Sequence, residues 1–190
     1  MLQAVLDIQV SIQKDLRLEK FFLGIIDGDY CAYKKDIPTG LKCLFILKYY
    51  SFESHFVTDY SISGFVSSVT RAKKKEMTPK IMSILNEGVE GIKMDLYYAG
   101  LEALKGRLDT TYQSVVSYDK APETLYQCQK NSTRTIMDEI LDKREELERF
   151  AEQIDVSKKQ YLHIARGKWL LYSFANTVYN NIRKVYRRTN

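Results

Sequence analysis

The chain has 190 residues, of which 45% are apolar and 28% charged, and its formal net charge is +5. This length suits one domain with a real hydrophobic core, and the composition is that of an ordinary soluble globular protein. No apolar run approaches the length that spans a bilayer and no secretory signal is visible, so we expect a cytoplasmic protein without a membrane partner.

The first third of the chain predicts an α/β core. Apolar residues recur at helical spacing over residues 2–17. Two short apolar runs follow, at about 20–27 and 43–47, and each is typical of a buried strand in a parallel sheet. A helix followed by two such strands indicates an α/β core.

Two carboxylates, Asp27 and Asp29, stand where the first strand would leave the sheet. Ligands of open α/β sheets bind at the carboxyl ends of strands, and paired acids can hold a divalent cation through oxygen. Asp-Gly after an apolar run is also a hairpin-turn pattern, so a simple turn is the alternative.

A third acid follows the second predicted strand. Ser51 is a plausible N-cap, which places Glu53 in the first turn of a short helix at the same sheet edge as the two aspartates. The alternative is that Glu53 only complements the helix dipole.

From residue 61 onward the pattern is helical. Thr78-Pro79 predicts the start of a helix whose four glycines, at 88, 91, 100 and 106, would break or kink it. Residues 133–154 predict one amphipathic helix with a paired, exposed polar face. Residues 109–131 show no clear pattern.

The closing helix is basic and is preceded by Gly167-Lys168. Residues 156–190 carry eight Lys or Arg and no Asp or Glu. Such a segment can bind nucleic acid phosphate, and a helix N-terminus with a lysine suits an anion. The alternative is a solvated helix face. The candidate phosphate-binding residues are Arg166, Arg183, Lys184, Arg187 and Arg188.

The cysteines and histidines give no sign of a further metal site. Cys31, Cys43 and Cys128 are scattered, as in a reduced cytosolic protein, and do not form a zinc or disulfide pattern. His55 and His163 lie far apart in the sequence and lack metal-ligand spacing.

Taken together, Gly-Ile-Ile-Asp-Gly-Asp-Tyr after an apolar strand, Tyr-Ser-Phe-Glu after the next one and a late Arg-Gly-Lys resemble Toprim-like proteins of prokaryotic phage defence. The nearest group includes the AriB effector, and overcoming-lysogenisation-defect nucleases are more distant. The resemblance implies that Asp27 and Asp29 bind Mg²⁺ or Mn²⁺ and that Glu53 and Lys168 are catalytic. Phe52 and Ser54 depart from the family's usual aliphatic residue and asparagine around Glu53.

The resemblance also implies a glutamate on an opening strand, and nothing of that kind precedes Asp27. We therefore expect a Toprim-like core over residues 1–60 that lacks its first strand or strands. Residues 61–190 would form a helical region whose basic C-terminal helix packs back on the core. The missing acid would come from another polypeptide, or the chain would be an inactive, truncated form.

Three functional hypotheses follow. The first is a metal-dependent nuclease, with Lys168 stabilising charge on the phosphate in the transition state and DNA or RNA as substrate. The second is a catalytically incomplete remnant or subunit that binds a partner ATPase or nucleic acid, with homo-oligomerisation left open. The third is an unrelated α/β binding module in which Asp27-Gly28-Asp29 is only a turn.

Overall fold

The computed structural model of the chain describes residues 2–29, 33, 40–57, 61, 64, 79–128 and 132–187. Arg188, Cys31 and the predicted N-cap Thr78 lie outside the described residues. Within them, the α-helices and β-strands in chain order are α1 (Leu2–Lys14), β1 (Gly24–Ile26), β2 (Leu44–Ile46), α4 (Pro79–Leu108), α5 (Ile136–Asp142), α6 (Arg144–Gln153), α7 (Tyr161–Ile164) and α8 (Gly167–Arg187). Four short 3₁₀ helices complete the set: η1 (Leu16–Lys20), η2 (Phe52–Phe56), η4 (Pro122–Tyr126) and η5 (Lys158–Gln160).

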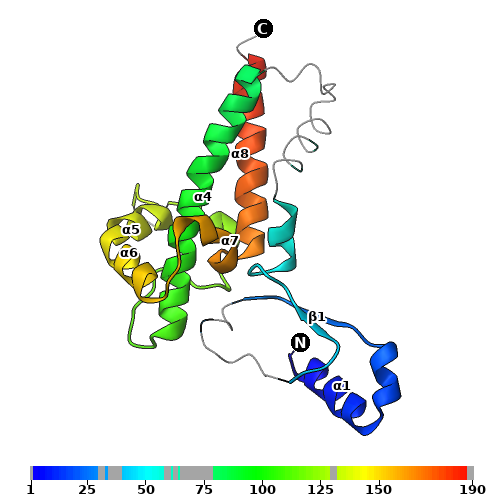
Figure 1. Cartoon of the computed structure of the whole chain (residues 1–190). Helices are drawn as coiled ribbons and strands as arrows, with labels where there is room; N and C mark the ends of the chain where they lie inside the picture. The colour runs from blue at the N-terminus through cyan, green and yellow to red at the C-terminus, as the bar shows by residue number, and fades with distance from the viewer. Residues whose placement is uncertain are drawn as a thin grey trace.

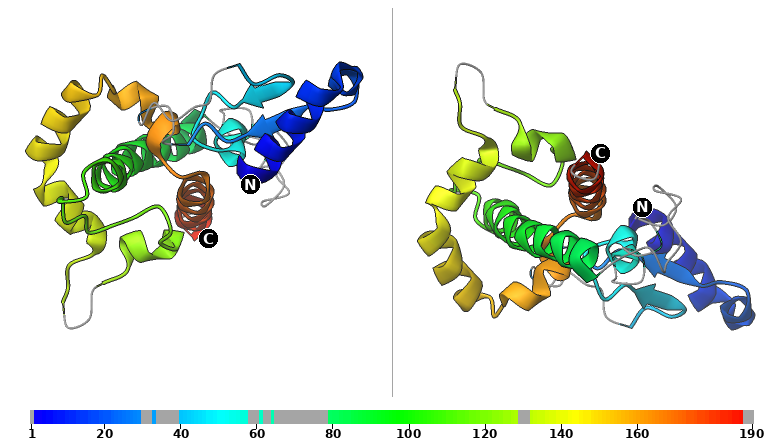
Figure 2. Two further views of the ribbon diagram at one scale, coloured as in Figure 1. Left: turned by 90° about the horizontal axis from the view of Figure 1, so that it is seen from below. Right: turned by 90° about the horizontal axis from the view of Figure 1, so that it is seen from above.

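The chain is mixed α/β but mostly helical. Helices α4 and α8 lie side by side and run in opposite directions, and α5, α6 and α7 surround the C-terminal half of α4 (Figure 1). Helix α1 and the two strands lie beyond the start of α8, on the other side from α5 and α6 (Figure 2). The sheet that the structure describes has two strands.

The strands pair in parallel, as the sequence predicts, with Ile25 opposite Phe45. Both strands are shorter than predicted, with three residues each. Leu16–Lys20, before β1, forms η1, where Asp15 accepts a hydrogen bond from the Arg17 backbone N–H at 3.1 Å. The strands are also less buried: Ile25 is 54% and Phe45 57% exposed. A two-stranded sheet has few neighbours to cover it, and here one face stays open.

The hydrophobic core lies in the helical region. From Leu96 to Leu104, α4 is buried on nearly every side, with Trp169 and Leu170 of α8 and Leu147 of α6 packed in the same cluster. This part of α4 is buried all round because helices cover it from several directions.

The four glycines of α4 predict a break or a kink, and the break is wrong, because α4 is continuous over 30 residues. A Cβ on Gly100 would lie 2.9 Å from the Ile164 carbonyl oxygen, and one on Gly88 would lie 2.8 Å from the Thr177 methyl carbon. These two glycines let α7 and α8 approach the α4 backbone closely, and packing offsets their low helix propensity.

The single helix predicted over 133–154 is also wrong, since α5 and α6 are separate elements joined at Lys143. Thr135 and Asp138 form a capping box at the start of α5. At the junction, the Lys143 ammonium donates to the buried Glu102 carboxylate at 2.9 Å. This hydrogen bond links the junction between α5 and α6 to α4.

The unpatterned stretch from 109 to 128 belongs to the core. Val116 and Leu125 are fully buried. The Tyr118 ring stacks on Trp169 with centroids 5.8 Å apart and on Tyr50 with centroids 4.8 Å apart. This stretch therefore connects the start of α8 to the segment that follows β2.

Candidate functional site

The chain beyond β1 stays paired with the chain beyond β2. The Gly28 N–H donates to the Tyr49 carbonyl at 3.2 Å, and the Asp29 N–H donates to the Tyr50 carbonyl at 2.8 Å. A Cβ on Gly28 would lie 2.4 Å from the Tyr49 oxygen and 2.5 Å from the Leu47 oxygen. Since β1 and β2 are parallel, Asp27-Gly28-Asp29 is not the turn of a hairpin, and only glycine fits between the two aspartates.

Asp27 ties the end of β1 to η2. Its Oδ1 accepts a hydrogen bond from the Phe52 backbone N–H at 3.0 Å, which satisfies a donor at the start of η2. Ser51 is the N-cap as predicted, but its hydroxyl makes no capping bond. The side chain of Asp27 is exposed and that of Asp29 is half-buried.

Glu53 occupies the first turn of η2, as predicted, and lies against the start of α8. A Cβ on Gly167 would lie 2.0 Å from the Ser51 hydroxyl oxygen, 2.8 Å from Glu53 Cβ and 3.0 Å from Glu53 Oε2. The carboxylate thus sits beside the positive end of a 21-residue helix.

The surroundings of Glu53 keep it ionised. The Ser51 hydroxyl donates to its carboxylate and is the largest cause of its lowered pKa. The Glu53 backbone N–H also lowers this pKa, and the positive charges of Lys168 and Arg166 contribute further. The predicted pair of Glu53 and Lys168 is therefore close enough to interact.

The remaining basic residues of the prediction divide into two groups. Arg166 lies beside the site, but its guanidinium donates to the Lys120 carbonyl at 2.8 Å, so it also anchors the 109–121 stretch. Arg183, Lys184 and Arg187 belong to the last turns of α8. At 1.5 Å per residue, Arg183 is roughly 22 Å along the helix from Lys168.

Asp27, Asp29 and Glu53 do not form a preformed metal site with three carboxylate ligands. Among the described residues, no group of three His, Cys, Asp or Glu side chains is arranged to hold a metal ion. Asp27 and Asp29 still supply two carboxylates, two positions apart in the sequence, just after β1. Mg²⁺ is commonly held by one or two carboxylates together with water and substrate phosphate, so this donor set fits a weakly held Mg²⁺.

Aromatic and histidine side chains that the sequence analysis did not assign gather around the same edge. Tyr49 contacts both histidines, with ring centroids 4.7 Å from His55 and 5.2 Å from His163. Burial lowers the pKa of His163, and the charge of Lys48 lowers it further. The clustering of Tyr, Phe and His between residues 49 and 56 was the feature of the sequence that could have indicated this aromatic group.

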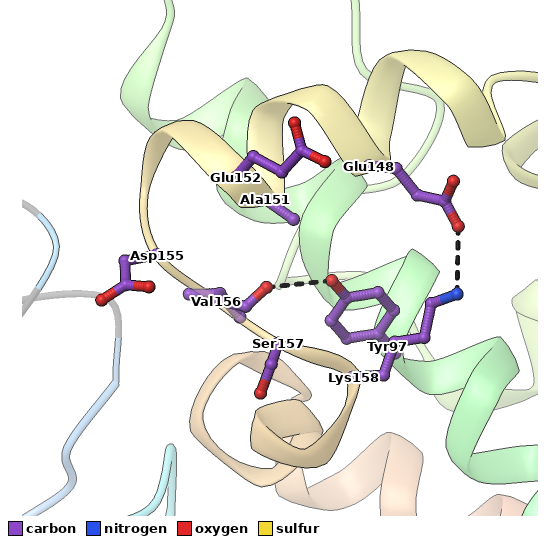
Figure 3. Close-up of a pocket in the computed structure, with 8 residues that line it drawn as sticks. All are labelled: Tyr97, Glu148, Ala151, Glu152, Asp155, Val156, Ser157 and Lys158. Atoms are coloured by element: carbon purple, nitrogen blue, oxygen red, sulfur yellow. Dashed lines mark hydrogen bonds and ion pairs between the residues drawn. The ribbon is translucent and has the colours of Figure 1, made fainter.

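A hollow of about 450 Å³ lies apart from this edge, against α6 and η5 (Figure 3). Its polar groups pair with one another: Tyr97 donates to the Val156 carbonyl at 3.0 Å, and Lys158 contacts Glu148 at 3.1 Å. The Tyr98 hydroxyl, which donates to this carboxylate, is the main cause that lowers the Glu148 pKa to about 2. Glu148 is thus paired within the fold, and none of the acids that line this hollow was predicted as a site residue.

No helix among the described residues combines the length and apolar character needed to cross a bilayer. Comparison of the chain with protein-family models, with curated proteins and with solved structures found no match.

Proposed function

We propose that this chain is a Toprim-like protein that cleaves phosphodiesters with Mg²⁺ or Mn²⁺ and acts as an effector of phage defence in the cytoplasm. The observation that carries the proposal is the meeting of three separate segments. Asp27 caps η2, and Glu53 of η2 lies against Gly167 beside Lys168. Acids and a lysine gathered at the carboxyl end of parallel strands are what this chemistry requires.

In this proposal Asp27 and Asp29 hold the metal ion. The bound ion would supply Lewis acidity, polarising a phosphate and lowering the pKa of a water molecule. The hydrogen bond from the Phe52 N–H orients one oxygen of Asp27 and leaves the carboxylate exposed to solvent. The parallel pairing around Gly28 fixes the spacing between the two aspartates.

Lys168 and Glu53 act as a unit beside the metal ligands. Because its pKa is lowered, Glu53 is a carboxylate at neutral pH and is suited to accept a proton or orient Lys168, not to donate a proton. The exposed Lys168 ammonium can move onto a phosphate oxygen and stabilise the charge that develops there. Arg166 remains anchored to Lys120 and contributes positive potential.

The family resemblance implies one more acid, a glutamate on a further strand of the sheet. Among the described residues β1 pairs with β2 along one edge, and no described residue pairs along its other edge. A strand carrying a glutamate could add to this edge by main-chain pairing and bring its side chain near Asp27.

The test is cleavage of DNA and RNA with Mg²⁺ or Mn²⁺, comparing the wild-type chain with Asp27→Asn. Asparagine retains an oxygen for the Phe52 N–H but removes the charge, so we expect loss of cleavage with the fold intact. Glu145→Ala, which removes an exposed acid on α6, is the matched control. Cleavage that survives Asp27→Asn would disprove the site assignment.

A catalytically incomplete subunit that binds a partner ATPase or nucleic acid is the second candidate. It is favoured by the exposed apolar sheet face, where Ile25 and Phe45 lie side by side and Phe21 and Leu23 precede them. Such a face is typical of an interaction surface. Calorimetric titration with Mg²⁺ and Mn²⁺ separates the two functions, since a folded chain that binds neither ion would be this subunit.

A further inference from the structure

Two exposed phenylalanines lie on the element that joins the proposed metal ligand to the proposed lysine. Phe52 is 56% and Phe56 52% exposed, and their rings meet edge to face with centroids 5.0 Å apart. By contrast, the nearby rings of Tyr50, Tyr118 and Trp169 stack on one another. The phenylalanine pair therefore presents aromatic surface to solvent that the fold does not use.

The backbone fixes the position of this pair relative to the site. The Phe52 N–H donates to Asp27, and Glu53, the next residue, lies against Gly167. Phe52 thus lies between the proposed metal ligand Asp27, which its own N–H contacts, and the start of α8, which Glu53 contacts. A nucleobase stacked on it would belong to a nucleotide close to the cleaved bond.

The charge around the pair suits a phosphate backbone. Lys168 and Lys48 are exposed beside η2, and Arg166 adds a third positive charge at the start of α8. Positive charge next to exposed aromatic rings is the usual arrangement of surfaces that bind single strands, where bases stack on the rings and phosphates follow the cations.

We propose that η2 is a base-stacking platform and that the substrate is a single-stranded or unpaired segment of nucleic acid. This rests on the proposed phosphodiester cleavage and names its substrate class. A base in an intact duplex is stacked on its neighbours and cannot lie on Phe52 or Phe56, whereas an unpaired base can. Any base can stack on an aromatic ring, so the platform would distinguish single strands from duplexes but would not distinguish one base sequence from another.

The test measures binding of the full chain to fluorescein-labelled 20-nucleotide single strands of DNA and RNA and to a duplex of equal length. EDTA prevents cleavage, and fluorescence anisotropy gives the Kd. We expect tighter binding of the single strands. Phe52→Ala should weaken single-strand binding about tenfold and duplex binding little, while Phe52→Tyr keeps the ring and most of the affinity.

Leu16→Ala is the control, because Leu16 is a large apolar residue that is 59% exposed but belongs to η1, and not to η2 or to the exposed sheet face. It should leave both Kd values unchanged, and circular dichroism checks that every variant is folded. Unchanged single-strand binding in both Phe52→Ala and Phe56→Ala, or an equal loss on the duplex, would overturn the platform. The first result would leave η2 as a contact surface for a protein.

The two proposals fail separately. Asp27→Asn should retain single-strand binding in EDTA while losing cleavage. If cleavage requires Asp27 but single-strand binding does not depend on Phe52 or Phe56, only the stacking platform is refuted. A chain that needs Phe52 to bind single strands but cleaves nothing would refute only the nuclease.

Discussion

The Glu53 carboxylate lies against Gly167, the first residue of α8, although 113 residues separate them in the sequence. A Cβ at position 167 would approach Glu53 Oε2 to 3.0 Å and the Ser51 hydroxyl oxygen to 2.0 Å. The contact joins the segment after β2 to the helical region. It also places the one acid of η2 beside the only lysine in the first turn of α8.

Gly167→Ala should therefore separate η2 from α8. The added methyl group overlaps Ser51 and Glu53, so we expect a loss of about 1–3 kcal/mol in the free energy of unfolding, measured by urea denaturation. Gly91→Ala is the control, because a Cβ there meets nothing within 4 Å inside α4. That change should stabilise the chain by roughly 0.5–1 kcal/mol. Equal stabilities of the two variants would contradict the close contact.

The pH dependence of the free energy of unfolding should reveal the contribution of the ionised Glu53 carboxylate. Its pKa is lowered in the folded chain, chiefly by the Ser51 hydroxyl, so ionised Glu53 favours folding. This contribution is present above the unfolded pKa of about 4.5 and is lost as the pH falls through the lower folded value. Glu53→Gln should be less stable than wild type at pH 7, and the difference should shrink below pH 4.5 in acid titrations followed by circular dichroism. A difference that stays constant with pH would exclude this charge effect.

Asp95 should show the opposite dependence. Burial raises the pKa of this α4 carboxyl to about 6, so the protonated form favours folding. The contribution of protonated Asp95 to the free energy of unfolding is fully present below pH 3.8 and is lost as the pH rises through about 6. Asp95→Asn mimics the protonated form. It should raise the free energy of unfolding at pH 8 by at most about 3 kcal/mol and change it little at pH 4. Urea denaturation at both values checks this, and an equal effect at the two pH values would contradict it.

The sequence predicts the local features of the site better than its surroundings. The parallel strands, Ser51 at the start of η2 and Gly167 at the start of α8 follow from short-range patterns, and the structure has all three. The sequence also predicts that Glu53 and Lys168 converge, and the structure places Glu53 of η2 near the charge of Lys168 at the start of α8. The metal ligands, the catalytic roles and the boundary at residue 60 stay predictions.

What could not be predicted depends on contacts between distant residues. His55 and His163 meet at Tyr49 only because α7 docks beside the chain that follows β2, where the Tyr50 N–H donates to the Leu162 carbonyl at 2.8 Å. Val116 and Leu125 lie in a mostly polar stretch, and no periodicity of apolar residues marks them as core. In both cases tertiary packing decides the outcome.

The α5–α6 break gives the last prediction, because Lys143 there pairs with a fully buried carboxylate. Glu102 accepts from the Tyr112 hydroxyl at 2.5 Å, from the Val115 N–H at 2.8 Å and from the Lys143 ammonium at 2.9 Å. Removing the lysine leaves a buried charge without its counter-ion. Lys143→Met should therefore cost about 3–5 kcal/mol in the free energy of unfolding, measured by urea denaturation.

Two variants make this test specific. Lys158→Met removes the exposed partner of Glu148 and should cost at most about 1 kcal/mol, as surface ion pairs do. Glu102→Gln combined with Lys143→Met removes both charges and should recover part of the loss, because the buried charge that lacked a partner is gone. If the double variant is no more stable than Lys143→Met alone, the lysine acts through packing at the helix junction and not through the charge of Glu102.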